Sequence, residues 1–538
     1  MPNIIKIPAK NGVTYIYEDK SVWDKEKGYS THKRKCIGKI GLDGNIEYNE
    51  FYKTREKVEK LEKSLSAPAV SKTTLVGQKL IIEKAVKETA LRKTLKEVFS
   101  KDETENLIAL ASYFICRGKA LSNAESWCED RAMGSINLAS QRVSEILKNL
   151  DDDKVNTFFK SWIALQAKGG NQLFDITSIS TYGKDNSYAE RGYNRDHENL
   201  EQINLSLLTS AKSGLPLWYS LLPGSMSDRI VLDFALEMLN KFDINTFTFF
   251  SDRGFYSDSN LKNLTSKGIK FTIPVPSSVK WQKEMISEHK LTLRNPQYVI
   301  EDKGSIIYGK TVYKMSEYGR TWYHIYFDPA RKETLTAAFM QKLQRYKEEL
   351  DSNKPIEEHK STYDKYFTIK ETPKRGKKVS YNQDAIDEYL NSDSCFWILM
   401  STSEKDTTKA LLQYRERNDV ELHFDDLKNL ADLYRLRNHN EKTIKGKLFI
   451  GFLALVILYQ LRKDVNDIPK KKRHYWSVNE MLDKVDTYSQ IHFIGKYKDI
   501  YTVPTANQRT IFDLLNISYS FKGREHNGEE VEPDTLEK

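Results

Sequence analysis

Three acidic residues stand where a carboxylate is costly unless it has a partner. Asp175 lies within an apolar, strand-like segment, Asp252 ends a second such segment, and Glu421 lies in a polar helical segment. A carboxylate inside or at the end of an apolar strand loses hydration, so it pairs with a cation or binds a metal ion. Three hard oxygen donors suit Mg²⁺ or Mn²⁺ better than zinc. Two such ions can activate a water or a 3′-hydroxyl for attack on a phosphodiester.

Each acid taken singly also has an ordinary structural explanation, as a helix cap, a turn residue or a surface charge. The other acids that compete for the same role are Asp185, Asp196, Asp228, Asp425 and Asp426. Asp228 is better explained as the cap of the helix that follows it. Asp425 lies one turn after Glu421 and is either a neighbour of the site or a solvated side chain.

The segment around Glu421 carries further polar groups at helical spacing. At about 100° per residue, Tyr414, Arg417, Glu421 and Lys428 fall on one face of a single predicted helix over 407–430. Apolar residues on the neighbouring stripe (Val420, Phe424 and Leu427) can dock this helix on a sheet. The cations could clamp phosphates, although an Arg417–Glu421 pair on a solvated helix explains the same spacing.

The elements that must position these residues indicate an α/β fold. Short apolar segments around 173–177, 202–209 and 217–222 predict an antiparallel meander that carries Asp175. Buried strands are predicted over 246–251 and 269–275, with a helix over 258–267 between them. Asp252 follows the first of these strands, at the end where open α/β sheets bind ligands.

Composition and pattern divide the chain into six expected regions. They are an N-terminal β region (1–60), a helical end-binding region (61–170), the first half of a catalytic core (171–276), an inserted β-rich domain (277–393), the second half of the core (394–465), and a C-terminal helical region with a polar tail (466–538). In the first region, Lys33, Arg34 and Lys35 are predicted at a hairpin tip. That tip either contacts DNA phosphates or is simply solvated.

These residues resemble the DDE transposases of bacterial insertion sequences, in the superfamily named after insertion sequence four. Tyr414, Arg417, Glu421 and Lys428 match its Tyr–x2–Arg–x3–Glu–x6–Lys motif at every position. The segments that contain Asp175 and Asp252 look like the first and second catalytic aspartate segments of the family. The stretch 277–393 fills the place of the β-rich insertion that the family carries.

The resemblance implies a ribonuclease-H-like mixed sheet core, interrupted by a β-rich insertion and preceded by an N-terminal β-hairpin and a helical region. It implies that Asp175, Asp252 and Glu421 are catalytic and hold two Mg²⁺ or Mn²⁺ ions. Tyr414, Arg417 and Lys428 would contact DNA phosphates, and Arg253 would touch DNA or form a structural ion pair. A tryptophan of the insertion, either Trp281 or Trp322, would contact a flipped or distorted base.

The expected function is cut-and-paste transposition, with metal-dependent cleavage at the ends of the element and strand transfer into target DNA. The expected partners are double-stranded DNA, as terminal inverted repeats and as target, and a second copy of the chain in a synaptic homodimer. Two alternatives stay open. One is a metal-dependent nuclease on the same fold, and the other is a non-catalytic protein that binds the element ends.

Composition agrees with a protein that handles nucleic acid. Lys and Arg number 84 against 75 Asp and Glu, and 30 Tyr and 8 Trp accompany the net charge of +9. Cations beside flat rings suit a polyanion that carries bases, although the same excess charge also serves solubility. With 25 Gly and 14 Pro, the chain is neither collagen-like nor dominated by linkers. Its 4 scattered cysteines form no zinc or disulfide pattern.

Targeting signals are absent from the sequence pattern. The N-terminus lacks the apolar stretch of a signal peptide. The apolar run 448–461 is shorter than the roughly 20 residues that span a bilayer, so we expect a buried core helix. The expectation is therefore a protein with no membrane association, located in the bacterial cytoplasm at the nucleoid.

Overall fold

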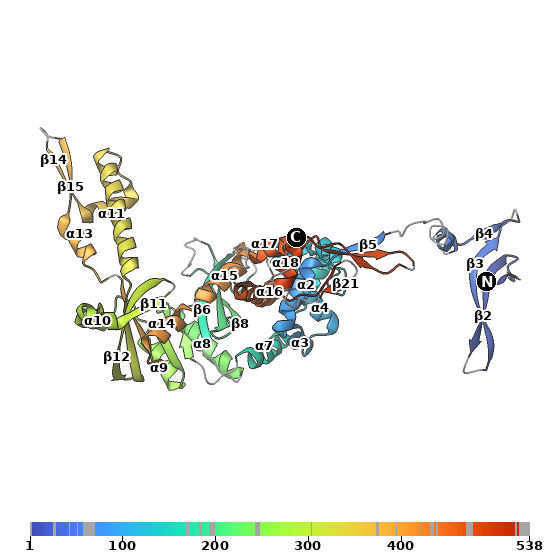
Figure 1. The fold of residues 1–538 in the computed structure, drawn as a ribbon, viewed down its shortest axis with the longest axis horizontal. Helices are drawn as coiled ribbons and strands as arrows, with labels where there is room; N and C mark the ends of the chain where they lie inside the picture. Colours follow the sequence, from blue (N-terminus) through green and yellow to red (C-terminus); the bar gives the residue numbers. More distant parts are fainter. Residues whose placement is uncertain are drawn as a thin grey trace, which may run out of the picture. The chain divides into compact units, whose positions relative to one another are not determined.

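The computed structural model describes residues 3–24, 28–41, 44–50, 52–57, 70–167, 172–181, 186–192, 200–226, 228–242, 248–302, 304–372, 376–393, 395–416, 418–430, 435–436, 440–469, 477–495, 497–521 and 524–526 (Figure 1). The chain divides into two compact units, residues 1–77 with 484–538 and residues 78–483. The second unit carries the whole of the predicted site. The six domain boundaries expected from the sequence stay predictions.

The first unit begins with an antiparallel meander where the sequence predicts a hairpin. Its strands, in spatial and chain order, are β1(Asn3–Pro8), β2(Thr14–Asp24), β3(Tyr29–Ile40) and β4(Ile46–Tyr48). Most of their side chains are exposed, but Ile16 and Ile37 are fully buried. Two buried isoleucines on neighbouring strands give this small sheet one apolar side.

The predicted lysine-rich hairpin tip is wrong, because Lys33, Arg34 and Lys35 lie within β3. Across the β2–β3 pair, Arg34 faces Asp19 and Lys35 faces Glu18. The Arg34 Nε donates to Asp19 Oδ1 at 3.4 Å. A ribbon exposed on both faces lacks the apolar alternation that marks strand ends, so its turn could not be located from the pattern.

The rest of the first unit joins segments from opposite ends of the chain. Strand β5(Val70–Leu75) pairs antiparallel with β18(Ser489–Phe493), which also pairs with β19(Ile500–Tyr501). Further elements are α18(Ala506–Leu514), β20(Tyr519–Phe521) and β21(Arg524–His526). The sequence predicts helical regions over 61–170 and 466–538. In the structure each region also contains a strand, because β5 of the first pairs with β18 of the second.

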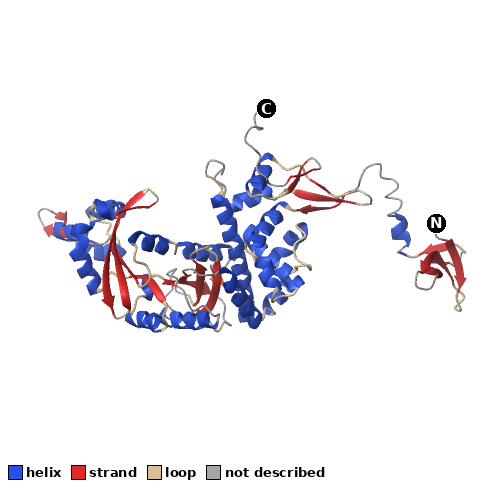
Figure 2. Cartoon of the chain, turned by 60° about the horizontal axis from the view of Figure 1, so that its bottom comes forward, coloured by secondary structure: helices blue, strands red, loops and turns tan. Residues whose placement is uncertain are grey.

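Helices form one part of the second unit (Figure 2). They are α2(Gly77–Glu88), α3(Leu91–Lys96), α4(Lys101–Arg117), α5(Ala124–Asp130), α6(Ser140–Lys148), α7(Asp152–Gln166), α16(Glu441–Asp467) and α17(Val478–Val485). A capping box starts α4, where Ser100 and Glu103 each bind the other's backbone N–H. The sequence signal for a helix from 75 to 99 is divided between α2 and α3, since Ala90 adopts a left-handed φ of 57°.

Helix α16 is the core of this helical part. It packs against α4, α6, α15 and β8, and Phe449 and Phe452 meet Phe158 and Phe159 of α7 edge to face. Within the described residues it is the single helix long and apolar enough to cross a membrane, and 83% of its most apolar window is buried inside the protein. The prediction of a buried core helix is thus met by extensive burial within the fold.

The central sheet of the second unit contains the predicted meander. The strands in spatial order are β11(Val299–Asp302), β12(Ser305–Ser316), β13(Gly319–Phe327), β16(Phe396–Ser401), β10(Lys270–Pro274), β9(Thr248–Phe250), β6(Gln172–Thr181), β7(Gln202–Ser210) and β8(Pro216–Pro223), with β17(Arg435–Leu436) beside β6. Strands β6, β7 and β8 are antiparallel neighbours, whereas β9 runs parallel to β6, and β10 runs parallel to β9. Helices α8(Asp228–Lys241) and α9(Asp258–Ser266) connect β8 to β9 and β9 to β10.

Half of the predicted insertion continues this sheet. Strand β16 pairs antiparallel with β10 on one side and with β13 on the other. Strands β12 and β13 both come from the stretch predicted as the insertion, 277–393. The boundaries predicted at 277 and 393 therefore do not coincide with an edge of the sheet, although helix α10(Lys280–Leu293) does separate β10 from β11.

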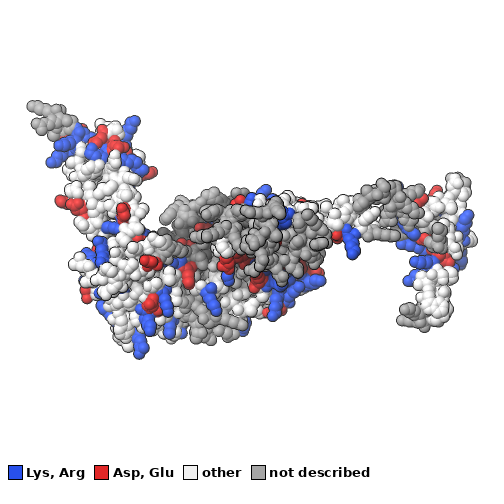
Figure 3. All heavy atoms as spheres, in the orientation of Figure 1, with Lys and Arg blue, Asp and Glu red and all other residues white. Residues whose placement is uncertain are grey.

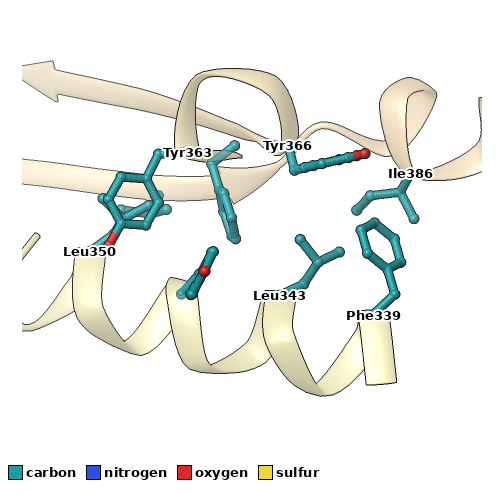
Figure 4. Close-up of a cluster of buried hydrophobic side chains, with 9 residues drawn as sticks. Phe339, Leu343, Leu350, Tyr363, Tyr366 and Ile386 are labelled. Carbon is teal, nitrogen blue, oxygen red and sulfur yellow. The ribbon is translucent and has the colours of Figure 1, made fainter. Parts of the chain in front are cut away.

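The other half of the insertion has a small core of its own, here called the outer subdomain (329–393). It contains α11(Pro329–Asp351), α12(Lys360–Tyr366), β14(Phe367–Thr372), β15(Gly376–Tyr381) and α13(Gln383–Leu390). Phe339, Leu343 and Leu350 line one side of α11 and meet Tyr363, Tyr366 and Ile386 (Figure 4). Apolar residues at helical spacing along α11 thus hold the β14–β15 hairpin and α13 against this helix.

Candidate active site

Asp175 and Asp252 come from neighbouring parallel strands. In the β6–β9 pair, Leu173 lies opposite Phe250. Asp175 lies on β6 two residues after Leu173, and Asp252 follows the end of β9 two residues after Phe250. Adjacent strands lie about 4.8 Å apart. Asp175 is 9% exposed and Asp252 is half-buried, so the fold brings two poorly hydrated carboxyl groups from distant segments side by side.

Backbone donors already orient both carboxyl groups. Asp175 Oδ1 accepts the N–H of Ile176 at 2.8 Å. Asp252 is the N-cap of the short 3-10 helix η2(Arg253–Phe255), and its Oδ1 accepts the N–H of Arg253 at 2.7 Å. Each carboxyl group is therefore oriented by a neighbouring backbone N–H.

An aromatic cluster fixes the backbone beside these two acids. The rings of Phe174 and Phe249 lie 5.7 Å apart, and the ring of Phe255 lies 5.8 Å from Phe174. All three rings are buried. Such pairs contribute about 0.5–1.5 kcal/mol each beyond their buried area, so the residues directly before Asp175 and just after Asp252 are held by packing.

Glu421 lies on α15(Asn418–Leu430), which packs against β6, β7 and α16. Phe424 and Leu427 are buried, as the predicted docking stripe requires, whereas Glu421 is exposed. The helix of the third acid therefore rests on the strand that carries Asp175.

Two contacts anchor α15. His423 is buried, and its Nε2 lies 2.9 Å from the carbonyl oxygen of Gly214 in the β7–β8 turn. Burial lowers the pKa of His423 to about 4, so its ring is neutral and donates this bond. Asp426 forms an ion pair with Arg462 of α16, whose Nη2 lies 2.6 Å from Asp426 Oδ1. Burial raises the pKa of Asp426 and Arg462 partly offsets that effect. Sequence reasoning gave His423 no role.

The predicted motif face is interrupted. The helix expected over 407–430 is two helices, α14(Thr407–Arg415) and α15, so Tyr414 does not share a helix with Glu421. Tyr414 is half-buried and packs against an apolar cluster that includes Leu411 and Tyr326. The prediction assumes one unbroken helix. In the structure α14 packs on β12 and α15 packs on β6, and these separate contacts outweigh the local preference for a single helix.

The predicted DNA-contacting cations lie in different surroundings. Lys428 is only 7% exposed on the last turn of α15, and its contact with DNA phosphates stays a prediction. Arg253 is exposed on η2, directly after Asp252. Arg417 lies outside the described residues. Of the competing acids, Asp185 and Asp196 also lie outside them, Asp425 is exposed, and Asp228 begins α8.

A ready-made metal cluster is not present among the described residues, where no three His, Cys, Asp or Glu side chains lie close enough together to hold an ion. The donor chemistry fits a hard divalent cation, because Asp175 and Asp252 supply only carboxylate oxygens. Glu421 does not complete a three-acid set with them in this arrangement. The joint role of the three acids as metal ligands stays a prediction.

Comparison with known proteins decides the family. The sequence profile of the family described as "Transposase DDE domain" matches residues 170–457, more than half of the chain and the whole span from Asp175 to Lys428. The chain belongs to the DDE transposase family. It is therefore an enzyme of DNA transposition, and proteins of this family bind DNA and generally use divalent metal ions.

The other comparisons add little to what is known of this DDE transposase from its family. A piggyBac transposase synaptic complex with hairpin DNA is similar in structure at 11% identity and a TM-score of 0.34, with 76% of each chain covered. No curated protein matches the chain. The motif subgroup predicted from Tyr414, Arg417, Glu421 and Lys428 is not decided by these comparisons.

A cavity of about 610 Å³ is lined by residues that follow Asp252 in the chain and by residues of α10, β12 and β13, and sequence reasoning missed it. Its aromatic and acidic lining residues are Tyr256, Trp281, Tyr318, Tyr323, Asp258, Glu284, Glu288 and Glu317. Trp281 packs edge to face on Tyr323 with ring centroids 5.2 Å apart. Trp322, the neighbour of Tyr323 on β13, points to the opposite face and packs on Tyr313. Tyr256, four residues after Asp252, was the signal available in the sequence.

Proposed function

We propose that this chain is the cut-and-paste transposase of an insertion sequence, in the Tyr–Arg–Glu–Lys subgroup of the superfamily named after insertion sequence four. One observation carries the proposal. Asp175 lies on β6 and Asp252 follows the end of the adjacent parallel strand β9, inside the matched transposase domain. Glu421 lies on a helix that packs against the strand of Asp175.

The proposed core is ribonuclease-H-like. Its support is the strand order β8-β7-β6-β9-β10, in which an antiparallel meander is followed by two strands parallel to β6. In this arrangement the first acid lies on the central strand of the sheet and the second follows the adjacent parallel strand. Strands β11 to β13 and the outer subdomain are then additions between the second acid and the third.

Asp175, Asp252 and Glu421 would hold two Mg²⁺ or Mn²⁺ ions. When bound, such ions activate the attacking oxygen and stabilise the leaving oxygen of a phosphodiester. Because Glu421 is exposed on α15 and does not yet join the aspartates, the proposal requires α15 and β6 to approach more closely when DNA is bound. The catalytic groups of an enzyme often tighten only in the substrate complex.

The remaining groups would position DNA. Arg253 is exposed directly after Asp252, so its guanidinium can bind a phosphate held near that aspartate. Tyr414, Arg417 and Lys428 would contact other phosphates near the cleaved end. Water then attacks the phosphorus and the 3′-oxygen leaves as a 3′-hydroxyl. That hydroxyl attacks a phosphodiester of the target, forming one bond for each bond broken, so no nucleotide cofactor is consumed.

Trp281 is the better candidate for contact with a distorted base. It lines the cavity together with Tyr256, whereas Trp322 packs on the other face of β13. An aromatic cavity can stack an unpaired base, and its carboxylates can accept hydrogen bonds from exocyclic amines. The backbone phosphates would stay outside this acidic cavity.

The proposed partners are the terminal inverted repeats of the element, target DNA, and a second copy of the chain in the synaptic complex. The N-terminal meander and the helices α2 to α7 would recognise the element ends. The proposed location is the bacterial cytoplasm, at the nucleoid. Phosphate contacts would make end binding strongly dependent on salt.

The test uses labelled duplexes carrying the inverted repeats that flank this reading frame, with Mg²⁺ and a target plasmid. Joined product supports a transposase. Cut ends without joining support the nuclease alternative, and a salt-sensitive shift without cleavage supports a non-catalytic end-binding protein.

Variants of the acids test the site itself. Asp175→Asn, Asp252→Asn and Glu421→Gln should each abolish cleavage while end binding stays within about twofold, because each removes one charge and no volume. Asp425→Asn, on the same helix as Glu421, is the matched control and should cleave normally. If Glu421→Gln cleaves at the wild-type rate, Glu421 is not a metal ligand.

A further inference from the structure

The β14–β15 hairpin of the outer subdomain has one apolar face and one basic face. Strand pairing places Phe367 opposite Tyr381 and Lys370 opposite Lys378. Phe367 and Val379 are buried in the small core of the subdomain. Because side chains alternate along a strand, Thr368, Ser380, Lys370 and Lys378 lie on the outward face, and all four are exposed.

Two lysines directly opposite each other are unfavourable in an antiparallel pair. Within the described part of the chain, no acid forms an ion pair with Lys370 or Lys378. The adjacent Lys377, by contrast, is used structurally, since its Nζ donates to the carbonyl oxygen of Leu350 and to Asn353 Oδ1 at 2.9 and 3.0 Å. Lys377 therefore stabilises the end of α11, whereas Lys370 and Lys378 both face solvent.

The outer subdomain exposes Lys and Arg side chains, with Asp and Glu side chains among them (Figure 3). Hydroxyl groups of Thr368 and Ser380 border the lysines on the same face. Paired ammonium groups with neighbouring hydroxyls on an exposed ribbon fit the phosphates of a DNA backbone.

We propose that the outward face of the β14–β15 hairpin is an auxiliary DNA-binding surface, which contacts the phosphodiester backbone without reading bases. This inference rests on the proposed function for the presence of DNA. It is independent of the acids that cut, because none of Asp175, Asp252 or Glu421 belongs to the outer subdomain. A two-stranded ribbon is narrow enough to follow a groove of duplex DNA.

The experiment measures binding of the full-length protein to a duplex that lacks the element ends, by fluorescence anisotropy over a series of salt concentrations. The double variant Lys370→Glu/Lys378→Glu keeps a like-charge pair at the same positions, so the folding penalty is matched. We expect its affinity to fall about tenfold or more near 0.1 M salt, and the slope of log K against log salt to decrease by about 1 to 2.

The matched control is Lys354→Glu/Lys360→Glu, which makes the same change in net charge at Lys354, just after α11, and at Lys360, the first residue of α12, in the same subdomain. Its affinity and slope should stay near wild type, and thermal unfolding should verify that both variants fold. Equal losses in the two double variants, or no loss in the first, overturn the inference. Loss of binding to anionic lipid vesicles without any change in DNA binding also overturns it.

End cleavage distinguishes this inference from the proposed function. If the wild-type protein cleaves element ends and the hairpin variant keeps wild-type affinity for DNA, the surface is wrong and the transposase proposal stands. If the wild-type protein never cleaves but the hairpin variant loses affinity and slope, the surface stands and the transposase proposal fails.

Discussion

At the residue scale, the candidate site depends on a glycine that carries no chemistry. Gly214 has a φ of +70° in the turn between β7 and β8, and its carbonyl oxygen accepts the hydrogen bond from His423. A Cβ on Gly214 would lie 1.6 Å from the hydroxyl of Tyr459. The turn is therefore built to let Tyr459 of α16 approach closely, while its carbonyl oxygen holds His423 of α15, the helix that carries Glu421.

Gly214→Ala should lower the free energy of unfolding by roughly 2–4 kcal/mol, because left-handed strain adds to overpacking against Tyr459. Gly268→Ala is the matched control. Its φ is +71° and nothing lies within 4 Å of the added Cβ, so it should cost only about 1 kcal/mol. Urea unfolding of both variants measures the difference, and equal costs would show that the turn can move aside.

The carboxyl groups make a second prediction at this scale. Removing divalent ions with a chelator should stop cleavage of element ends and leave end binding nearly unchanged, since the phosphate contacts come from Arg and Lys. Mg²⁺ or Mn²⁺ should restore cleavage, and Ca²⁺ should support it poorly because its coordination is looser. Cleavage that persists in excess chelator would contradict the proposed metal ligands.

At the element scale, α15 is held on the fold by its neighbour α16. The ion pair between Asp426 and Arg462 joins the two helices, and their side chains are 13% and 35% exposed. An acid that is partly buried depends on its cation, because desolvation opposes its charge. The position of Glu421 thus relies on a contact that lies more than a helical turn away.

Arg462→Met should destabilise the protein by about 1–2 kcal/mol at pH 7, since it leaves the Asp426 carboxylate without its partner. The loss should be smaller at a lower pH, because burial raises the pKa of Asp426 and its carboxyl group takes up a proton more readily than an ordinary aspartate. The double variant Asp426→Asn/Arg462→Met should recover part of the stability. Unfolding curves at the two pH values check this, and a pH-independent loss argues that Arg462 acts through packing alone.

A buried histidine ties the inserted strands to α14. The Nδ1 of His324 on β13 lies 2.7 Å from Thr311 Oγ1, and its Nε2 lies 3.1 Å from the carbonyl oxygen of Glu404. Because a carbonyl can only accept, Nε2 carries the proton and Nδ1 accepts from Thr311. Thr311 also meets Thr407, the first residue of α14, at 2.6 Å. This network needs the neutral ring.

Burial lowers the pKa of His324 to about 4, below the ordinary value of 6.5. Between pH 6.5 and pH 4, His324 is therefore protonated in the unfolded chain but neutral in the folded chain. The free energy of unfolding falls as the pH drops through this range. The full effect amounts to roughly 3 kcal/mol. His324→Gln should flatten this slope while lowering stability at pH 7, as measured by urea unfolding across pH. An unchanged slope would assign the acid sensitivity to other groups.

At the scale of the whole molecule, distant segments complete each unit. Strand β5 near residue 70 pairs with β18 near residue 490, and β16 joins β10 to the strands of the insertion. The three acids of the proposed site are likewise far apart in the chain, at 175, 252 and 421. Assembly of the site therefore requires most of the second unit to be folded.

The proposed synaptic complex makes a prediction at this scale. With end-bearing duplexes, mass photometry should detect a species of about twice the 62.5 kDa protomer mass plus two duplexes. Glu421→Gln should assemble it without cutting, whereas random duplexes should not support it. A saturating complex with one protomer for each end would contradict the homodimer.

Local pattern predicted the elements well where one side of an element is buried. The meander that carries Asp175, the strand before Asp252, the docking residues Phe424 and Leu427, and the buried core helix now seen as α16 all follow from apolar spacing. Such spacing reports burial and period directly. The pattern failed at the exposed β2–β3 ribbon and at the break between α14 and α15, where no buried stripe or long-range contact is visible in the local sequence.

The sequence by itself provided the candidates for chemistry: three acids, their order, and the spacing of Tyr414, Arg417, Glu421 and Lys428. Only the tertiary structure decided that Asp252 follows the strand next to that of Asp175, that Lys428 is buried, and that Lys370 faces Lys378. Register and partner choice arise from packing between segments far apart in the chain, so they are absent from any local window of sequence.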